Sequence, residues 1–581
     1  MEPRSFAAWL CLLGVVVMRN AGPVQGNGSP QLPLASFQDA NGDWHLERVN
    51  DLGESRRGLI ERRRKRSQDQ VKLVQDEVKV WPMPVSLKHG RGALSLDRKR
   101  FSFEVSEGSA VPDTLAQAFS RYSDIIFGQH FSISASPLAR TLVKLVVTLG
   151  SLDEELQYGV DESYKLDIPD SSRENVAHLA APTVYGALRG LETFSQLATF
   201  SFESKSMQIN KTPYIIKDFP RFPYRGLLVD TARHYQPISS IKRILDSMAH
   251  SKLNVLHWHI VDEQSFPLEI PSYPSLWKGA YSYAERYTLD DAREIVRYAR
   301  LRGINVMPEV DMPGHAASWG VGYPDLWPSP DCLMPLDVSK NITFDVINGI
   351  FQDFKSVFPF KFAHLGGDEV NMDCWTQTHH IRSWLIHNNF TTKDAYADFV
   401  TRAQDIALNH GFEPVNWEET FYSFPSKLRN KTVVHNWLNG GTCQKAVKLG
   451  FRCIMSDQAF WYLDHLDAAW HGFYNTEPLH NITDAHERSL VIGGEVCMWG
   501  ETADASNVMQ TIWPRAAAAA ERLWSAFNVT KHGHKRAVQR LQHFRCLLNK
   551  RGIAAAPVLE GSEYYYFGRA SPTEPGPCFE Q

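Results

Sequence analysis

The chain has 581 residues and a formal net charge of −4, and its charged residues are of mixed sign. This balance argues against a nucleic-acid-binding protein, which would usually carry a basic face, and it provides no broad field to steer an anionic partner. Hydrophobic residues make up 43% and charged residues 22% of the chain, as in a globular protein. The length exceeds one ordinary core, so we expect two domains with extensions.

The first segment, residues 1–26, has the features of a secretory signal peptide. Arg4 supplies a charged start, residues 6–18 form an apolar run, and small residues follow. The run is too short for a membrane anchor, and no other apolar stretch of the sequence is long enough to span a bilayer. We therefore expect the secretory pathway, ending in the vacuole, the lysosome or the extracellular space.

Asn-x-Ser/Thr sequons support this compartment, because glycosylation occurs along that pathway. Asn27 is the weakest of them, since Pro30 follows it. The six predicted glycosylation sites are Asn210, Asn341, Asn389, Asn430, Asn481 and Asn528. Seven cysteines follow the signal peptide, so at least one has no partner within the chain, and none forms the CxxC pair typical of structural zinc.

Two regions precede the main repeat of the sequence. Residues 27–77 are polar and include the basic run 62–66, which indicates a flexible leader that is solvated or removed by processing. Residues 78–215 mix two β-rich runs with two helical patterns, namely 141–149, 162–168, 113–127 and 183–200. This mixture predicts a smaller α+β domain.

From residue 216 to 581, strand-like runs alternate with helical patterns. The expected strands are 224–230, 253–262, 303–311, 361–368, 412–418, 432–438, 451–456 and 491–501. The clearest helical patterns are 238–252, 289–302, 344–358, 393–410 and 442–449, with 515–524 and 535–549 closing the chain. Thr288 and Asp291 resemble a capping box at the start of the second helix. The alternation predicts a (β/α)₈ TIM barrel of the α/β class as the catalytic domain. The alternative, an open doubly wound sheet, would need a Gly-rich phosphate loop that we do not find.

The ends of the expected strands carry acids, aromatic rings and histidines. Active sites of such barrels lie at these carboxyl ends. The residues there include the run from Arg225 to Asp230, followed by His259, Asp262, Glu309, Asp311, His315, Asp368, Glu369, Trp417, Glu418, Trp437, Tyr462, Asp464, Trp499 and Glu501. Carboxylates transfer protons and bind hydroxyl groups, and aromatic rings stack on sugar faces. The set predicts acid/base chemistry on a neutral, polyhydroxylated ligand.

The most specific motif is His364-Leu365-Gly366-Gly367-Asp368-Glu369, at the end of an apolar strand. Two adjacent acids repel each other, so we expect their environments to separate their pKa values and leave one protonated and one charged. An isolated Asp-Glu pair is usually a solvated helix start, but two glycines at a barrel strand end favour catalysis. His257 and His259 share one face of a strand, yet no third metal ligand is evident. We expect neither a metal nor another cofactor.

These motifs resemble those of glycoside hydrolase family 20, the β-N-acetylhexosaminidases, and most of all its lysosomal-type and secretory eukaryotic members. The resemblance covers about residues 80–580, and its motifs are 225–230, 257–262, 313–315, 364–370 and 494–501. It implies an exo-acting, retaining hydrolase of terminal β-linked GlcNAc or GalNAc. In this family the acetamido oxygen of the substrate attacks the anomeric carbon, which gives an oxazoline intermediate.

The resemblance also implies a role for each site residue. Glu369 matches the general acid/base, Asp368 the residue that orients the acetamido N–H, and Tyr462 the residue that binds the acetamido oxygen. The other matches are Trp417, Trp437 and Trp499 as pocket walls, Arg225 and Glu501 on the distal hydroxyls, and Asp262 with His315 as a network that tunes the acid.

One position departs from a part of the family. Members that accept sulfated sugars carry an Arg after an Asn where this chain has Asp464-His465. A carboxylate near the outer hydroxyl of the sugar repels sulfate, so we expect neutral substrates.

The resemblance further pairs Cys332 with Cys374 and Cys546 with Cys578, and it makes a homodimer an expectation. Cys443, Cys453 and Cys497 stay unassigned, with a Cys443–Cys453 bridge left open.

Two alternatives to this function remain at the level of the sequence. A lectin on the same fold would keep the tryptophans and lose the acid, whereas Glu369, Asp368 and Tyr462 are all present. A conventional retaining glycosidase would use a carboxylate nucleophile, with Glu501 or Asp262 as the candidates.

Overall fold

The computed structural model describes residues 78–558 apart from 109, 129–139, 171–174, 202–203 and 439, together with Cys578 and two short strands near the N-terminus. These strands, β1 (Ala35–Gln38) and β2 (Trp44–Glu47), pair antiparallel within the unit Met1–Val78, so the predicted leader contains one small sheet. The predicted signal peptide, Asn27 and the basic run 62–66 lie outside the described residues. The unit Lys79–Gln581 holds the rest of the fold.

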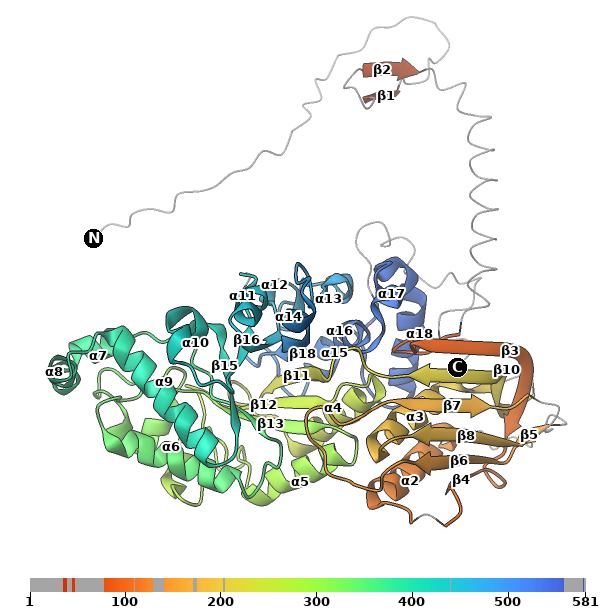
Figure 1. Cartoon of the computed structure of the whole chain (residues 1–581), viewed down its shortest axis with the longest axis horizontal. Helices are drawn as coiled ribbons and strands as arrows, with labels where there is room; N and C mark the ends of the chain where they lie inside the picture. The colour runs from red at the N-terminus through yellow and green to blue at the C-terminus, as the bar shows by residue number, and fades with distance from the viewer. Residues whose placement is uncertain are drawn as a thin grey trace, which may run out of the picture. The chain divides into compact units, whose positions relative to one another are not determined.

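A mixed sheet forms the first part of this unit (Figure 1). Its strands are β3 (Ser86–Leu96), β4 (Ser102–Val105), β5 (Thr141–Leu142), β6 (Lys144–Leu149), β7 (Tyr164–Ile168), β8 (Val176–Ala181), β9 (Ala198–Ser201) and β10 (Ser206–Asp218). They follow the order β4-β6-β8-β7-β10-β3-β5, and β9 pairs with β10. Helix α3 (Val184–Leu197) packs against β7 and β8, and α2 (Asp113–Phe127) packs against α3. The run expected over 183–200 is thus a helix followed by a strand.

A closed parallel barrel follows, and it confirms the predicted fold class. Its strands are β11 (Tyr224–Asp230), β12 (Val255–Val261), β13 (Asn305–Val310), β14 (Phe362–His364), β15 (Glu413–Trp417), β16 (Val433–Asn436), β17 (Arg452–Met455) and β18 (Val491–Met498). Each corresponds to a predicted run. Most are shorter than predicted, because the residues beyond the strand ends turn into loops. β18 pairs with β11, so the barrel has no free edge.

Helices surround the barrel and close the chain. The longer ones are α4 (Ile238–His250), α5 (Leu289–Arg300), α6 (Asn341–Phe354), α8 (His379–His387), α9 (Thr392–Asn409), α16 (Arg515–Trp524) and α18 (Val538–Lys550). The shorter ones are α7 (Asp373–Gln377), α10 (Glu418–Ser423), α11 (Thr442–Lys448), α12 (Gln458–Trp461), α13 (Trp470–Asn475), α14 (Ala485–Leu490), α15 (Val508–Ile512) and α17 (Phe527–Thr530). Short 3₁₀ helices span Pro274–Gly279, Ala317–Val321, Pro324–Leu326, Pro425–Lys427 and His534–Arg536.

Local sequence chemistry accounts for where several helices begin. The predicted capping box of α5 is present, with the Thr288 hydroxyl and the Asp291 carboxylate each accepting a backbone N–H. Thr391 and Asp394 form a second one at the start of α9. Such caps satisfy N–H groups that a helix cannot satisfy internally, which fixes the loop that precedes each helix.

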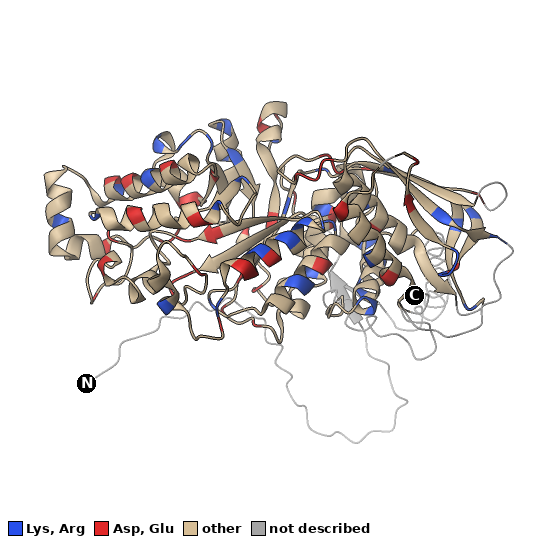
Figure 2. Ribbon diagram, turned by 90° about the horizontal axis from the view of Figure 1, so that it is seen from below, with Lys and Arg blue, Asp and Glu red and all other residues tan. Residues whose placement is uncertain are grey.

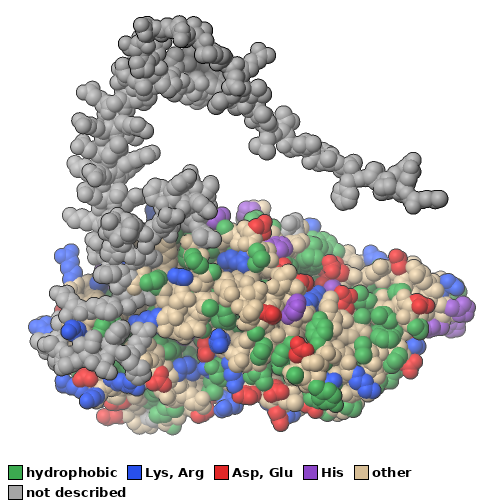
Figure 3. Space-filling model, turned by 180° about the vertical axis from the view of Figure 1, so that it is seen from behind, with side chains coloured by type: hydrophobic (Ala, Val, Ile, Leu, Met, Phe, Trp, Pro, Cys, Tyr) green, Lys and Arg blue, Asp and Glu red, His purple; other side chains and the backbone are tan. Residues whose placement is uncertain are grey.

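The surface and the cysteines agree with the expectations from composition. On the face drawn in Figure 3, acidic and basic side chains are interspersed. In the part of the chain that the structure describes, no helix is both long and apolar enough to cross a bilayer. Cys332–Cys374 and Cys546–Cys578 are disulfides, as predicted; Cys443–Cys453 is a third, and Cys497 is buried and free. All six predicted glycosylation asparagines are exposed.

Candidate active site

A loop with two glycines leads from β14 to the two adjacent acids. Gly366 and Gly367 have φ angles of +62° and +96°, which side chains other than that of glycine rarely adopt. A Cβ atom on Gly366 would also collide with the carboxylate of Asp311. Glu369 itself has a φ of +48°, an uncommon value for a residue with a side chain. The glycines are therefore needed to turn the chain sharply and present Asp368 and Glu369 at the barrel mouth.

Buried polar groups hold this loop from below. The hydroxyl of Tyr396, on α9, donates to the carbonyl of Gly367. Asn416, on β15, donates from Nδ2 to the carbonyl of Gly366 at 3.0 Å, and Gln404 donates to Oδ1 of Asn416 at 2.8 Å. Because buried carbonyl groups need partners, these contacts fix the course of the backbone just before the acids.

Asp368 and Glu369 lie in different environments, which separates their pKa values. Asp368 is only 9% exposed, and burial raises the pKa of its carboxyl group. The side chain of Glu369 is 59% exposed, and a hydrogen bond with His315 lowers the pKa of Glu369. The expected separation is present, but its order is the reverse of the one that a protonated Glu369 and a charged Asp368 would require. The cause is that the loop buries the first acid and leaves the second in water beside an imidazole.

Asp311 is a third acid in this group. Its carboxyl oxygen, the ring nitrogen of His315 and the carboxyl oxygen of Asp368 lie within 4.8 Å of one another. Burial and the charge of Asp368 raise the pKa of Asp311 well above its ordinary value. A protonated Asp311 can donate a hydrogen bond to Asp368, which lets the two acids share this buried site with one negative charge.

A chain of hydrogen bonds runs from the barrel interior toward Glu369. Nδ1 of His259 lies 2.5 Å from Glu309, Nε2 of His259 lies 2.7 Å from Asp262, and Nδ1 of His315 lies 3.1 Å from the other oxygen of Asp262. Although burial opposes it, the hydrogen bond with Asp262 and the charge of Asp368 raise the pKa of His315. The structure brings the predicted pair Asp262 and His315 together and adds His259 and Glu309 behind them.

Arg225 does not reach this site, and the prediction that it binds sugar hydroxyls is wrong. It is the second residue of β11, at the opposite end of the barrel, and is fully buried. Its guanidinium donates to both carboxylate oxygens of Glu162, at 2.7 and 2.8 Å, and to the carbonyl groups of Phe222 and Lys252. Arg225 therefore joins the sheet region to the barrel foot.

Arg233 is the arginine at the mouth, and the sequence analysis missed it. It lies just beyond the end of β11 and contacts Asp230 at 3.0 Å, Asp262 at 2.9 Å and Glu501 at 3.6 Å. Its guanidinium also lies 5.1 Å from the ring centre of Trp499. Arg233 places a fixed cation beside Glu501, where Arg225 was expected. The available signal was its position three residues after the strand end.

Aromatic rings form one side of the site. Trp437 and Trp499 are partly buried and pack on a cluster that contains Trp417, Tyr462 and Cys497. The ring of Tyr462 stacks 6.4 Å from that of Trp437 and lies 6.1 Å from that of Trp499. Trp417 is 1% exposed and donates from Nε1 to Glu309 at 3.0 Å. Trp417 is thus more deeply buried than Trp437 and Trp499, and its role as a wall of the sugar pocket stays a prediction.

Glu419 is a site residue that the sequence analysis passed over in favour of its neighbour Glu418. Glu418 is fully buried and accepts a hydrogen bond from Asn436 at 2.7 Å. Glu419 instead accepts from the indole N–H of Trp437, at 3.0 and 3.1 Å. Burial and the charge of Asp368 raise the pKa of Glu419 to about 8. It fixes the orientation of the Trp437 ring.

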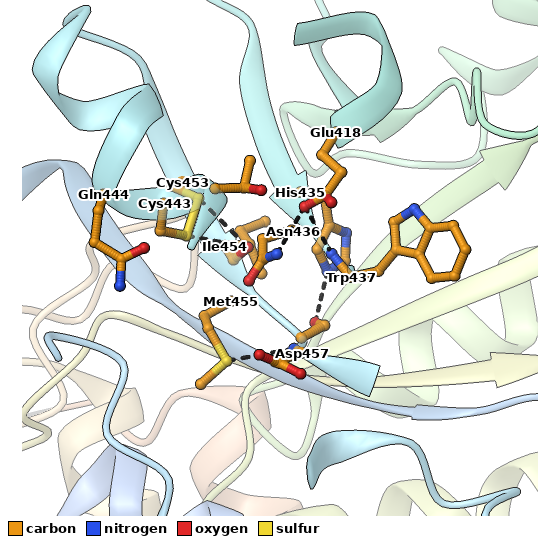
Figure 4. Close-up of a disulfide and its surroundings, with 12 residues drawn as sticks. Glu418, His435, Asn436, Trp437, Cys443, Gln444, Cys453, Ile454, Met455 and Asp457 are labelled. Atoms are coloured by element: carbon orange, nitrogen blue, oxygen red, sulfur yellow. Dashed lines mark hydrogen bonds between the residues drawn. A yellow bond between two sulfur atoms is a disulfide. The ribbon is translucent and has the colours of Figure 1, made fainter. Parts of the chain in front are cut away.

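A disulfide lies behind the strands that carry this wall. Cys443 on α11 and Cys453 on β17 are joined next to β16, the strand that ends before Trp437 (Figure 4). Asn436, at the end of β16, also donates to the carbonyl of Leu438 at 2.8 Å, which fixes the turn after the strand. The bridge therefore ties α11 to the strands beneath the aromatic wall.

Two carboxylate oxygens at the site are buried and have no hydrogen-bond partner among the described residues, namely Oδ1 of Asp368 and Oδ1 of Asp464. Asp464 lies near His465, with Nε2 of that ring 3.8 Å from Oδ2, and near Glu501. Burial raises the pKa of Asp464 to about 6. Unpartnered buried acceptors are costly, so both oxygens are suited to receive donors from a ligand.

The histidines of the barrel interior do converge with acids, which the sequence did not reveal. His257, Glu309 and His364 bring ligand atoms together, and so do His257, His435 and Glu495. However, the charges of Glu495 and Glu309 overcome burial and raise the pKa of His257 to about 9. The ring nitrogens of His257 lie 2.7 Å from Glu495 and 2.9 Å from Glu309, as in buried ion pairs.

Comparisons with known proteins agree with this geometry. Residues 222–527 match the profile described as "Glycosyl hydrolase family 20, catalytic domain", and residues 80–197 match "beta-acetyl hexosaminidase like". Beta-hexosaminidase 1 of Arabidopsis thaliana is 56% identical over 86% of this chain and 94% of its own length. Beta-hexosaminidase subunit alpha of Rattus norvegicus is 39% identical over 83% of this chain and 94% of its own. The Flavobacterium johnsoniae chitobiase structure has a TM-score of 0.72 and 29% identity, covering 82% of this chain and 73% of that one. The chain therefore belongs to glycosyl hydrolase family 20 and is a glycosidase.

Proposed function

We propose that the chain releases non-reducing terminal β-linked N-acetylhexosamine from glycans, with the acetamido group of the substrate as the nucleophile. The observation that supports this most strongly is the pairing of an exposed acid, Glu369, with a buried acid, Asp368, on one short loop. Two adjacent acids cannot flank opposite faces of a sugar, as the two-carboxylate mechanism requires. One of them can protonate the leaving oxygen while its neighbour orients an internal nucleophile.

In this mechanism each residue acts at a defined point. Glu369 donates its proton to the glycosidic oxygen and later accepts one from water. Asp368 accepts the acetamido N–H at its unpartnered Oδ1 and stabilises the positive charge of the oxazolinium. Tyr462 binds the acetamido oxygen, and Trp437 and Trp499 contact the apolar face of the ring.

A bound sugar would bring the two pKa values into the order that this chemistry needs. The aglycone covers Glu369 and removes water from it, which raises its pKa. The acetamido N–H donates to Asp368 and favours the charged form, which lowers its pKa. The positive charge of His315 then stabilises the carboxylate that Glu369 becomes when it releases its proton.

Charged groups at one end of the site support the exo-acting character. Arg233, Glu501 and Asp464 gather where the outer hydroxyl groups of a terminal sugar would lie. Their charged groups can exchange hydrogen bonds with those hydroxyls, which suits a sugar that ends the chain. Arg233 takes the role that the sequence analysis gave to Arg225.

The function is tested with a panel of GlcNAc- and GalNAc-capped oligosaccharides and chromatographic detection of the released monosaccharide. We expect release of single terminal β-linked N-acetylhexosamine units and retention of the uncapped core. Release of disaccharides, or binding without release, would favour an endo-acting enzyme or a lectin.

A secretory destination, either vacuole, lysosome or extracellular space, fits the exposed sequon asparagines and the disulfides. The homodimer stays a prediction from the family resemblance.

The hydroxyl of Tyr396 is expected to contribute to turnover because it positions the loop that precedes Asp368. Tyr396→Phe removes the hydrogen bond to Gly367 and loosens the loop that carries both acids. We expect kcat to fall about two- to tenfold, the worth of one hydrogen bond, with little change in KM. Tyr298→Phe, which removes a hydroxyl bonded to Asp246 on another part of the barrel, serves as the control. An unchanged kcat in folded Tyr396→Phe would contradict a positioning role.

Activity on 6-sulfated N-acetylglucosaminides is expected to be weak at neutral pH and to rise, relative to the unsulfated sugar, as the pH falls through about 6. The pKa of Asp464 is raised to about 6, so its carboxylate repels sulfate above that pH and is neutral below it. The measurement is the ratio of kcat/KM for the two substrates between pH 5 and 7.5. The titration of catalytic groups changes kcat/KM of both substrates alike, so its effect cancels in the ratio. Asp464→Asn should raise the ratio at neutral pH and flatten its pH dependence. A wild-type preference for the sulfated sugar at neutral pH would contradict this.

A further inference from the structure

A hollow of about 930 Å³ lies outside the active site, between helices α2, α4, α5 and α18. Figure 1 shows α2, α4 and α5 close together in the lower middle of the molecule. None of the active-site residues described above lines it. His250, at the end of α4, and Leu301, just after α5, both contribute to its surface, so it lies toward the foot of the barrel.

The hollow is strongly basic. Seven basic and three acidic side chains line it, in a chain whose overall charge is slightly negative. Figure 2, which views the molecule from below, shows Lys and Arg on the central helices. Two of the three acids are already neutralised: Asp246 pairs with Arg302 at 2.5 Å, and Glu294 pairs with Lys242. Glu192, which lies outside the lining, likewise pairs with Arg551 at 2.8 Å. Arg121, Arg243 and Arg297 nevertheless outnumber Asp124, the one acid of the lining that is not in these pairs.

The inner cations of the hollow lie close enough to repel one another. Arg121 donates only to the carbonyl of Leu301, at 3.2 Å, and burial together with the charge of Arg302 lowers its pKa. Burial and the charge of Arg551 likewise lower the pKa of Lys550. Nε of Arg551 is buried and has no hydrogen-bond partner among the described residues. Crowded, partly desolvated cations of this kind are stabilised when an anion enters between them.

The rim carries two further guanidinium groups. Arg243 on α4 and Arg297 on α5 are exposed, line the hollow and make no hydrogen bond or ion pair within the described part of the chain. Arginine is suited to phosphate and sulfate because its planar fork can donate two parallel hydrogen bonds to such a group. Arg121 inside the hollow and Arg243 and Arg297 on its rim can therefore bind more than one phosphate or sulfate group.

We propose that this hollow is a binding site for a compact ligand that carries two or more phosphate or sulfate esters. The volume falls within the range of small-molecule sites. The chain as a whole mixes acidic and basic residues and has a formal net charge of −4, which disfavours an extended polyanion such as a nucleic acid. The site is separate from the carboxyl ends of the barrel strands, so such a ligand binds without occupying the sugar pocket.

The test is titration calorimetry of the full chain with myo-inositol hexakisphosphate and, separately, sucrose octasulfate, at physiological salt. We expect saturable binding of at least one probe, and the stronger of the two identifies the ester class. Arg297→Gln and Arg121→Gln should each weaken binding about tenfold, the worth of a charge-assisted contact. Arg382→Gln, an exposed arginine on α8 outside the hollow, should not change it. Higher salt should weaken the binding.

Arg297 is exposed and unpartnered, so its substitution leaves the fold intact and decides the question even if Arg121→Gln fails to fold. Equal binding by wild type, Arg297→Gln and Arg382→Gln would overturn the proposal, and so would no binding of either probe below about 1 mM. Glycosidase activity should be the same in Arg297→Gln as in wild type. Failure of this proposal therefore leaves the proposed function untouched, and the reverse also holds.

Discussion

A β-glucoside is expected to be hydrolysed at least about a thousandfold more slowly than the otherwise identical N-acetyl-β-glucosaminide. The two sugars differ only at C2, where the glucoside has a hydroxyl in place of the acetamido group. An internal nucleophile held against the anomeric carbon has a large effective concentration, which in the best intramolecular cases corresponds to roughly 7–11 kcal/mol. Asp368 and Tyr462 have nothing to hold in the glucoside. The measurement compares kcat/KM for the two 4-nitrophenyl glycosides.

The rival mechanism makes the opposite prediction. If Glu501 or Asp262 were the nucleophile, the glucoside would react at a comparable rate, and a 2-fluoro sugar would label that carboxylate covalently. Asp262 is fully buried and bonded to His259, His315 and Arg233, which leaves it no path to the anomeric carbon. We therefore expect intact-protein mass spectrometry to find no labelled species.

Glu369→Gln is expected to lower turnover by about 10²–10⁴-fold, the usual contribution of a positioned proton donor. The loss should be smaller for aryl glycosides with acidic leaving groups, because these leave with less protonation. The substitution keeps the size of the side chain and replaces its ionisable carboxyl group by a neutral amide that cannot act as the acid. The measurement is kcat for a series of leaving groups of increasing acidity in wild type and variant.

Glu263→Gln is the matched control, because Glu263 is another glutamate of the barrel mouth, next to Asp262, and its carboxylate bonds Gln264. It should leave kcat close to wild type for every leaving group. An equal loss across the leaving-group series in Glu369→Gln would show that Glu369 is not the acid.

The barrel could be predicted from the sequence because its signals are local. Each strand is a short apolar run, each helix has an amphipathic period, and the capping box at Thr288 marks one helix start. The catalytic motif was readable for the same reason, since Gly366 to Glu369 are consecutive. The split of the 183–200 run was not, because a helix and a strand of similar hydrophobicity follow each other without a break signal.

The sequence motif pointed to Arg225 as the arginine that binds the sugar, whereas the structure places Arg233 at the barrel mouth. Both residues lie near β11, but a strand rises about 3.3 Å per residue, so Arg225 and Asp230, five steps apart, are separated by roughly 17 Å. This distance separates the foot of the barrel from its mouth. The motif shows that an arginine is present near this strand, but it does not show how far along the barrel axis the arginine lies. That position depends on where the strand begins and ends.

Contacts between distant segments were also beyond the sequence. Glu309 contacts His259, His364 and Trp417 from three other strands, and no spacing along the chain announces that convergence. Glu419 could not be separated from Glu418, because which of two adjacent acids faces the site depends on how α10 leaves β15. The order of the pKa values at Asp368 and Glu369 likewise depends on burial that only the fold sets.

The most direct test of substrate assistance is inhibition by a thiazoline fused to the sugar at C1 and C2, which mimics the oxazoline intermediate. A site built around that intermediate should bind the thiazoline at least about a hundredfold more tightly than the product N-acetylglucosamine. Asp368→Asn should remove much of this advantage, because the charge that stabilises the intermediate is lost, and should change binding of the product far less. An inhibition constant for the thiazoline no lower than that of the product would contradict the account.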